Sequence, residues 1–189
     1  MSTKRRQLGV TLVELIVFVV IVSIAVAGIL GVMSLTTAQS ADPLRRKQAL
    51  MIAESLMEEV QMADFTVCDP ASPDANNATN AFECAIAENW GPEAGNSRPF
   101  DNVNDYVGGS GTPSTVFMAG QNIIDATGSA FNVTGYSATV TITPTTLGGI
   151  GGGGASADTA VLHIRVAVSY DGANSIVLDG YRTRHAPVI

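Results

Sequence analysis

The residue with the clearest chemical consequence in this sequence is an acid, Glu14, inside a long apolar segment. The segment covers residues 10–33, and its other polar side chains are the hydroxyls of Thr11 and Ser23. A carboxylate at the centre of a membrane-spanning helix costs about 2.5–3.5 kcal/mol, so such groups are usually paired and mark function. Either Glu14 pairs with a positive charge, or it lies near the membrane interface and reaches headgroups or water.

The apolar segment has the length and the flank of a membrane anchor. A helix rises about 1.5 Å per residue, so about 20 apolar residues cross the hydrocarbon core of a bilayer. The apolar core of a cleaved secretory signal peptide is shorter, at about 7–15 residues. Because Lys4, Arg5 and Arg6 precede the segment, we expect its N-terminal end to stay in the cytoplasm and the body to be translocated.

The residues around this acid form the motif Gly9-Val10-Thr11-Leu12-Val13-Glu14-Leu15, which follows the basic leader. The motif resembles the processing site of type IV prepilins and pseudopilins, although that family usually has Phe or Met where this chain has Val10. The resemblance implies that a prepilin peptidase removes residues 1–9 by cutting between Gly9 and Val10, and that Val10 is then N-methylated. It also implies that Glu14 pairs with the new α-amino group and registers subunits in a filament.

The remaining sequence predicts an α+β fold in which a helix packs on an antiparallel sheet. Residues 44–63 have helical spacing, and Pro43 is expected to kink or restart the helix there. β-Branched runs at 136–143, 161–170 and 175–184 predict strands. The expected helix stripe consists of Leu50, Ala53, Leu56, Met57 and Val60.

Together with the resemblance, these elements predict the type IV pilin fold. The leader occupies residues 1–9, and a transmembrane and filament-core helix occupies residues 10–33. An amphipathic helix follows at 34–65, a disulfide-containing αβ loop region at 66–121 and an antiparallel β-sheet at 122–189.

Two cysteines, Cys68 and Cys84, form an even pair in a short chain that carries an export signal. In an oxidising compartment this pattern favours a disulfide. Two buried free thiols are the alternative. A metal site is disfavoured, because the cysteines lack CxxC spacing and only His163 and His185 could assist them.

Carboxylates and amides are concentrated in residues 100–106, at Asp101, Asn102, Asn104 and Asp105. Oxygen ligands of this kind suit calcium. However, the segment has neither the twelve-residue loop with a terminal Glu nor the glycine of the sharp turn. A hydrogen-bonded turn is therefore favoured over a calcium site, and no metal is expected.

Composition and motifs argue against several functions. Without the three basic residues of the leader, seven of the ten basic residues remain against 17 acidic ones, a poor balance for binding nucleic acid. The nearest approach to a GxSxG motif, residues 108–112, fails at Thr112, and no HExxH motif occurs. The glycine-rich residues 148–154 lack a following Lys-Ser/Thr. We expect no enzymatic activity, no cofactor, no nucleic acid and no small-molecule substrate.

Phrases in the body of the chain also resemble one subgroup of the family, the MSHA-pilus minor pilin MshD. The phrases are residues 48–59, 68–70, 100–106 and 180–184. This resemblance implies a low-abundance subunit that starts in the bacterial inner membrane and moves into a surface filament. Its partners would be other pilins, the prepilin peptidase and the pilus assembly platform. Two alternatives stay open: a pseudopilin of type II secretion, and an adhesin displayed at a filament tip.

Overall fold

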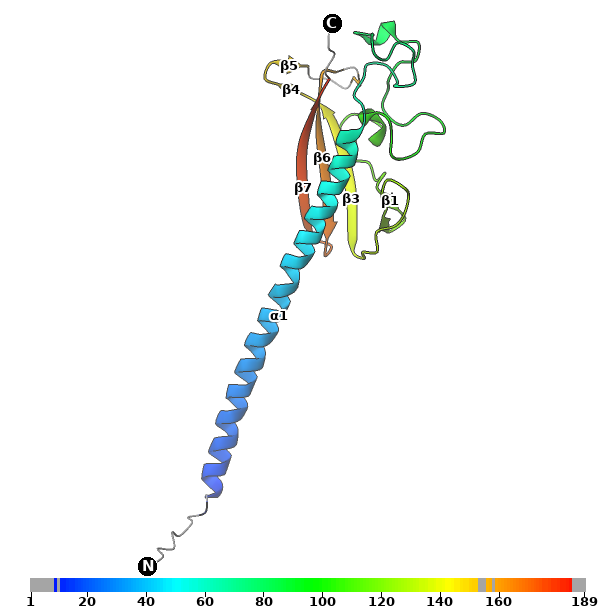
Figure 1. Ribbon diagram of the computed structural model, residues 1–189. Helices are drawn as coiled ribbons and strands as arrows, with labels where there is room; N and C mark the ends of the chain where they lie inside the picture. Colours follow the sequence, from blue (N-terminus) through cyan, green and yellow to red (C-terminus); the bar gives the residue numbers. More distant parts are fainter. Residues whose placement is uncertain (1–8, 10, 153–155, 158, 185–189) are drawn as a thin grey trace, which may run out of the picture. The chain divides into compact units, whose positions relative to one another are not determined.

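In the computed structural model, residues 9, 11–152, 156–157 and 159–184 are described, with the backbone alone for residues 35–42. The chain divides into two compact units, Met1–Leu44 and Arg45–Ile189, which are treated separately. One long helix, α1, runs from Leu12 to Met62, and strands follow it in the sequence (Figure 1). The α+β class predicted from the sequence is confirmed, and it is consistent with a type IV pilin fold.

Helix α1 passes through Pro43 without a break, so the expected restart of the helix at this residue is wrong. Proline removes one backbone donor from the helix interior, but its fixed φ of about −65° is itself a helical value. The helical residues on both sides therefore continue as one element.

The second unit buries one face of α1. Ile52, Leu56 and Val60 recur at a spacing of four residues and are 7%, 1% and 0% exposed. The predicted stripe is correct except for Leu50, which is 36% exposed because Ala49 and Ile52 occupy the inward positions of that turn. The full buried face consists of Ala49, Ile52, Ala53, Leu56, Met57, Val60 and Ala63.

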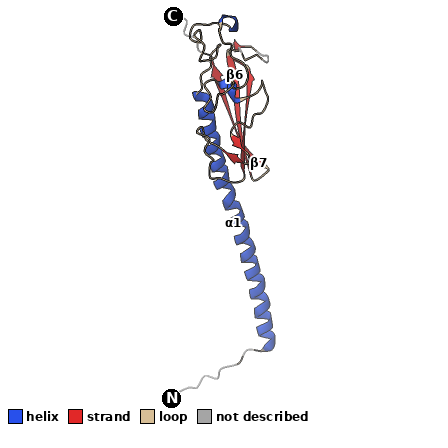
Figure 2. Cartoon of the chain, turned by 90° about the vertical axis from the view of Figure 1, so that its right-hand side faces the viewer, coloured by secondary structure: helices blue, strands red, loops and turns tan. Residues whose placement is uncertain are grey.

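The sheet contains strands β3 (Tyr136–Pro144), β6 (Val161–Tyr170) and β7 (Asn174–Thr183), in the antiparallel order β3-β6-β7. Strand β6 lies at the centre, and its Val166 pairs with Val140 on one side and with Leu178 on the other. Burial alternates along β3, as expected for a sheet with one covered face. Within the second unit, the C-terminal part of α1 lies along this sheet (Figure 2).

A small residue allows the helix to approach the sheet closely. An added Cβ at Gly180 of β7 would lie 2.7 Å from Gln61 Nε2 and 3.1 Å from Met57 Sδ. The side chains of α1 therefore occupy the space above this strand. Nearby, Arg182 Nη2 donates to the carbonyl of Ala63 at 3.1 Å, which fixes the end of the helix.

Shorter elements complete the second unit. Two two-stranded ribbons pair β1 (Met118–Ala119) with β2 (Asn122–Ile123), and β4 (Thr146–Leu147) with β5 (Ile150–Gly151). The 3₁₀ helices η1 (Ala81–Glu83) and η2 (Val103–Tyr106) lie between α1 and the strands in sequence. All four residues of η2 are buried, so this turn is part of the core.

A buried ion pair holds the loop region against α1. Arg98 donates from Nε to Glu59 Oε1 at 2.8 Å and from Nη2 to Glu59 Oε2 at 2.6 Å. The two side chains are only 6% and 11% exposed. Tyr106 also donates its hydroxyl to Glu59 at 3.1 Å, and the Arg98 guanidinium lies 4.7 Å from the centre of the Phe117 ring. Each member of the ion pair therefore has a further partner: Tyr106 for Glu59 and the Phe117 ring for Arg98.

Removing the Arg98 side chain should strongly destabilise the protein. Arg98→Ala leaves the Glu59 carboxylate buried without its cation, which costs about 3–5 kcal/mol of unfolding free energy. Arg165→Ala is the matched control, because it removes an arginine that is 55% exposed in its pair with Asp179 and should cost about 0–1 kcal/mol. Urea unfolding of the two variants measures the difference, and equal losses would contradict the role given to the buried pair.

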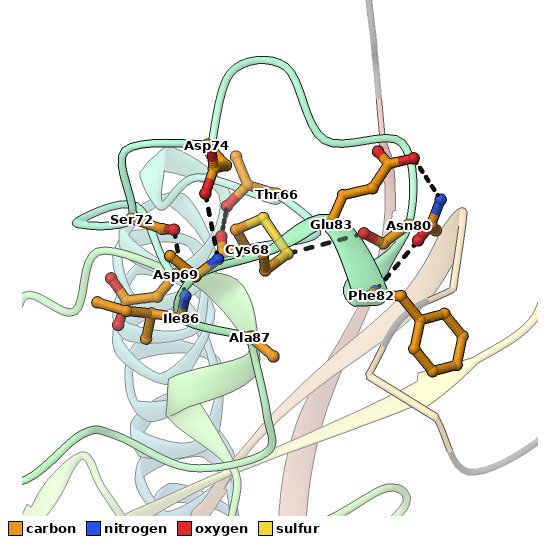
Figure 3. The surroundings of a disulfide bond; sticks show 12 residues. Thr66, Cys68, Asp69, Ser72, Asp74, Asn80, Phe82, Glu83, Ile86 and Ala87 are labelled. Carbon is orange, nitrogen blue, oxygen red and sulfur yellow. Dashed lines mark hydrogen bonds between the residues drawn. A yellow bond between two sulfur atoms is a disulfide. The ribbon is translucent and has the colours of Figure 1, made fainter.

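The predicted disulfide joins Cys68 to Cys84, with their Cα atoms 5.4 Å apart. It closes a loop of turns that contains η1 (Figure 3). Beside it, the Asp69 amide donates to the carbonyl of Ile86 at 3.1 Å, and the Glu88 amide donates to the carbonyl of Val67 at 3.4 Å. The crosslink therefore fastens the segment after α1 to the segment that carries Glu88.

Reduction of this disulfide should loosen residues 69–83 before the rest of the second unit. A crosslink around a loop of this size stabilises by about 3 kcal/mol in the loop-entropy model. Limited proteolysis with and without reductant, followed by mass spectrometry of the fragments, should place the first new cuts between the cysteines. Equal cleavage rates under the two conditions would show that the crosslink does not hold this loop.

Candidate functional site at the start of the helix

The helix begins with a local cap. Thr11 accepts two bonds: its Oγ1 accepts the Glu14 amide at 3.3 Å, and its carbonyl accepts the Leu15 amide at 3.1 Å. A threonine three residues before a glutamate is the sequence pattern of a helix-capping box. Thr11 therefore sets where α1 starts, a role that the sequence interpretation missed although the Thr-x-x-Glu spacing could have revealed it.

Glu14 lies in the first turn of α1 and is exposed. A negative charge is favourable there, because the unpaired amides at a helix N-terminus carry partial positive charge. Within the part of the chain that the structure describes, the Glu14 side chain makes no ion pair and no side-chain hydrogen bond. The carboxylate is therefore available for an ion pair with a positively charged group outside this segment.

The helix that follows is apolar, and its side chains are exposed as far as Ser34. From Leu12 to Ser34, the helix has a mean hydropathy of 3.1 over 23 residues, and none of them is buried. Leu12, Phe18 and Ile24 are 74%, 65% and 69% exposed. The polar side chain of Ser23 is satisfied locally, since its hydroxyl donates to the Val19 carbonyl at 2.7 Å. This helix is long and apolar enough to cross a membrane.

The proposed cleavage position lies just before the helix. Gly9 is exposed, it is outside α1, and an added Cβ there would meet no atom within 4 Å. Nothing in the described structure therefore demands glycine at position 9. Val10, the expected N-methylation residue, lies outside the described residues, so cleavage and methylation stay predictions.

The predicted site residues divide between the two units. Gly9 and Glu14 belong to the first unit, whereas Cys68 and Cys84 belong to the second and serve its internal structure. The second unit also gathers three acids that the sequence interpretation did not connect, Glu88, Glu93 and Asp105. Folding brings these acids together from separate segments, and sequence spacing holds no signal for that.

Comparison with known proteins identifies one part of the chain. Residues 4–30 match the family model described as the prokaryotic N-terminal methylation motif. No curated protein and no solved structure matches the chain. The matched region contains the basic leader, Gly9, Glu14 and most of the exposed apolar helix.

The motif, the apolar helix and the α+β body agree with one another. They are consistent with membrane anchoring and with a structural subunit that associates with other pilins and with a prepilin peptidase. The chain carries the prokaryotic N-terminal methylation motif, which supports its place among the type IV pilin-like and pseudopilin proteins.

Proposed function

We propose that the chain is the precursor of a minor pilin in an MSHA-like type IV pilus, where it helps to initiate filament assembly and adhesion. The observation that carries this proposal is the methylation motif at residues 4–30, which overlaps a helix whose apolar surface is exposed from Leu12 to Ser34. A membrane and neighbouring helices are the two environments that cover such a surface.

The first step of maturation is removal of the leader, residues 1–9. The prepilin peptidase cuts between Gly9 and Val10 on the cytoplasmic face and leaves the apolar helix in the mature subunit. Because no contact in the described chain requires glycine at position 9, the requirement comes from the enzyme that reads the site. The new α-amino group at Val10 lies four residues before Glu14 and is then methylated.

Glu14 registers the subunit in the filament. Opposite charges about 4 Å apart attract by about 4 kcal/mol at an effective dielectric constant of about 20, and more weakly in water. An apolar helix bundle therefore strengthens a pairing between the Glu14 carboxylate and the terminal amine of the same or a neighbouring subunit. The partners in this assembly are other pilins and the pilus assembly platform, and the subunit moves from the inner membrane to the surface filament.

The choice of the MSHA system rests on the body of the chain. Residues 48–59, 68–70, 100–106 and 180–184 resemble MshD, and the methylation motif alone does not separate a pilus subunit from a pseudopilin. Immunogold labelling of intact cells separates these two candidates. Label along or at the ends of surface filaments supports the pilus subunit, and label confined to the periplasm supports the secretion pseudopilin.

Glu14→Ala should leave membrane insertion and leader cleavage intact but reduce the subunit in sheared filaments about tenfold or more, since about 1.4 kcal/mol corresponds to a factor of ten. Glu14→Asp keeps the charge and should retain part of the incorporation. The first turn has two roles, capping of the helix by Thr11 and charge pairing by Glu14. Thr11→Val separates them, because it removes the capping hydroxyl and leaves the Glu14 carboxylate. Immunoblots of filament and membrane fractions give the ratio, and normal incorporation of Glu14→Ala would refute the pairing.

Mass spectrometry of subunits from sheared filaments should find a mature N-terminus at Val10 that carries an added methyl group. Gly9→Val should block the cut, because a branched side chain then occupies the position before the scissile bond. The uncut precursor should accumulate in the membrane. A filament subunit that begins at any other residue would overturn the assignment of the leader.

A further inference from the structure

A compact acidic cluster lies in the second unit, and one of its members, Glu88, follows the disulfide residue Cys84 by four positions. Carboxylate oxygens of Glu88, Glu93 and Asp105 all lie within 4.8 Å of one another. Glu88 is 5% exposed and Asp105 is 2% exposed, whereas Glu93 is half-buried. Three carboxyl groups thus converge at a place where two of them are buried and the third is partly exposed.

Most of the buried oxygens in this cluster have no hydrogen-bond donor. Among the described residues, neither carboxylate oxygen of Glu88 has a partner, and Asp105 Oδ1 has none either. Asp105 Oδ2 accepts the Asn102 amide at 3.2 Å, and Glu93 Oε2 accepts Asn96 Nδ2 at 3.4 Å. Buried polar atoms normally find partners, so the two orphaned oxygens of Glu88 and the one of Asp105 are free to bind a positive group.

The electrostatics agree with this geometry. Burial raises the pKa of Glu88 to about 8, and the carboxylates of Asp105, Glu93 and Asp69 add to the rise, while the nearby Asn89 amide opposes it without forming a well-aligned hydrogen bond. Burial also raises the pKa of Asp105 to about 7, with Glu93 as the next cause. No ion pair among the described residues involves any of the three acids. Burial and the neighbouring carboxylates therefore both oppose ionisation of Glu88 and Asp105, and a bound cation would offset this cost.

The surrounding fold holds these residues in position. The Asn102 side chain and Asp105 form a reciprocal capping box at η2, which orients Asp105. The Gly91 amide donates to the Asn104 carbonyl at 3.2 Å and ties the segment carrying Glu88 and Glu93 to η2. The backbone bond from Glu88 to Val67, together with the disulfide, anchors the other end of that segment.

We propose that Glu88, Glu93 and Asp105 bind a calcium ion. The donors are carboxylate oxygens only, which suits a hard cation, and both cysteines are engaged in the disulfide. Calcium accepts six to eight oxygen ligands in flexible geometry, so Glu88 can bind through both oxygens and water can enter from the side of Glu93. The ligands come from two segments, unlike those of a twelve-residue calcium loop. The site would clamp residues 88–93 onto η2.

The test uses the full chain in detergent, stripped with a chelator and then titrated with calcium and with terbium(III). Trp90 is the single tryptophan of the chain and lies between Glu88 and Glu93 in sequence. Terbium bound at the site should therefore emit when the tryptophan is excited, and calcium should displace it. We expect an affinity in the range of about 10⁻⁴–10⁻³ M, as in extracellular calcium modules, together with a rise in Tm.

Three variants make the test specific. Glu88→Gln should weaken calcium binding about tenfold or more, because it replaces a charged ligand by a neutral side chain of similar shape. The same change should raise the Tm of the metal-free protein, since it relieves the repulsion among buried carboxylates. Glu54→Gln removes an exposed acid of α1 and should change neither result. Trp90→Phe should abolish the terbium emission and keep the calcium-dependent rise in Tm.

The pH dependence offers a second readout. The folded state holds protons on Glu88 and Asp105 more tightly than the unfolded state, so the metal-free protein should lose stability as pH rises from about 4.5 to about 8. Asp69, Glu93 and Asp101 are the charged neighbours that strengthen this trend. Calcium at about 1 mM should reduce the loss.

The outcomes are distinct. A calcium-dependent Tm that disappears in Glu88→Gln supports the site. If calcium at about 1 mM changes neither the Tm nor the terbium emission of the parent chain, the proposal fails, and the buried acids are held as protonated carboxyl groups. If Glu54→Gln weakens binding as much as Glu88→Gln does, the ion is bound by general surface charge, which also overturns the site. The filament proposal is unaffected by either failure.

Discussion

The core of the second unit is built on the burial of one face of α1 against the β3-β6-β7 sheet. Ala49, Ala53 and Val60 are 0% exposed, and small residues at this contact bring the helix backbone near the strands. Gly180 does the same from the side of the sheet, where Met57 and Gln61 occupy the volume of a missing side chain. Burial of apolar area contributes about 25 cal/mol per Å², so this face is a main source of stability.

The same helix has a second apolar stretch, which is exposed in the part of the chain that the structure describes. Apart from Glu14, Ser23 and Ser34, residues 12–34 are apolar on all sides of the helix, whereas residues 49–63 are apolar on one face only. A helix that is apolar on all sides requires lipid or other helices. The methylation motif overlaps this stretch, and the cleavage and the carboxylate pairing that we propose there concern assembly and not the folding of the body.

Two groups of buried charge in the second unit behave in opposite ways. Glu59 has Arg98 in a two-bond pair and Tyr106 as a further donor, and burial with Glu59 nearby raises the pKa of the Tyr106 phenol. Glu88 and Asp105 are buried to a similar degree and retain unpaired oxygens. The loop region is thus fastened firmly at Arg98, while the carboxyl oxygens of Glu88 have no hydrogen-bond donor among the described residues. This contrast within one loop region is the reason for assigning structure to the first group and ligand binding to the second.

The sequence by itself determined the elements whose signals are local. The leader, the apolar helix and Glu14 are contiguous, and β6 has the predicted bounds, because β-branched alternation is a property of neighbouring residues. The disulfide was expected because the chain has an even number of cysteines and an N-terminal segment typical of exported proteins. The sequence interpretation failed at two residues. Leu50 was expected on the buried face but is exposed, because Ala49 and Ile52 take the inward positions. Pro43 was expected to restart the helix, but α1 continues through it.

The tertiary structure alone decided which distant polar residues meet. Arg98 reaches Glu59 across 39 positions, and Asp105 joins Glu88 and Glu93 through a backbone bond at Gly91. No periodicity marks such pairs, since loops can bring segments together at many sequence separations with only a slow change in closure entropy. For residues 100–106 the sequence therefore led to a hydrogen-bonded turn, which η2 is, but it held no information on the acids that face Asp105 from residues 88–93.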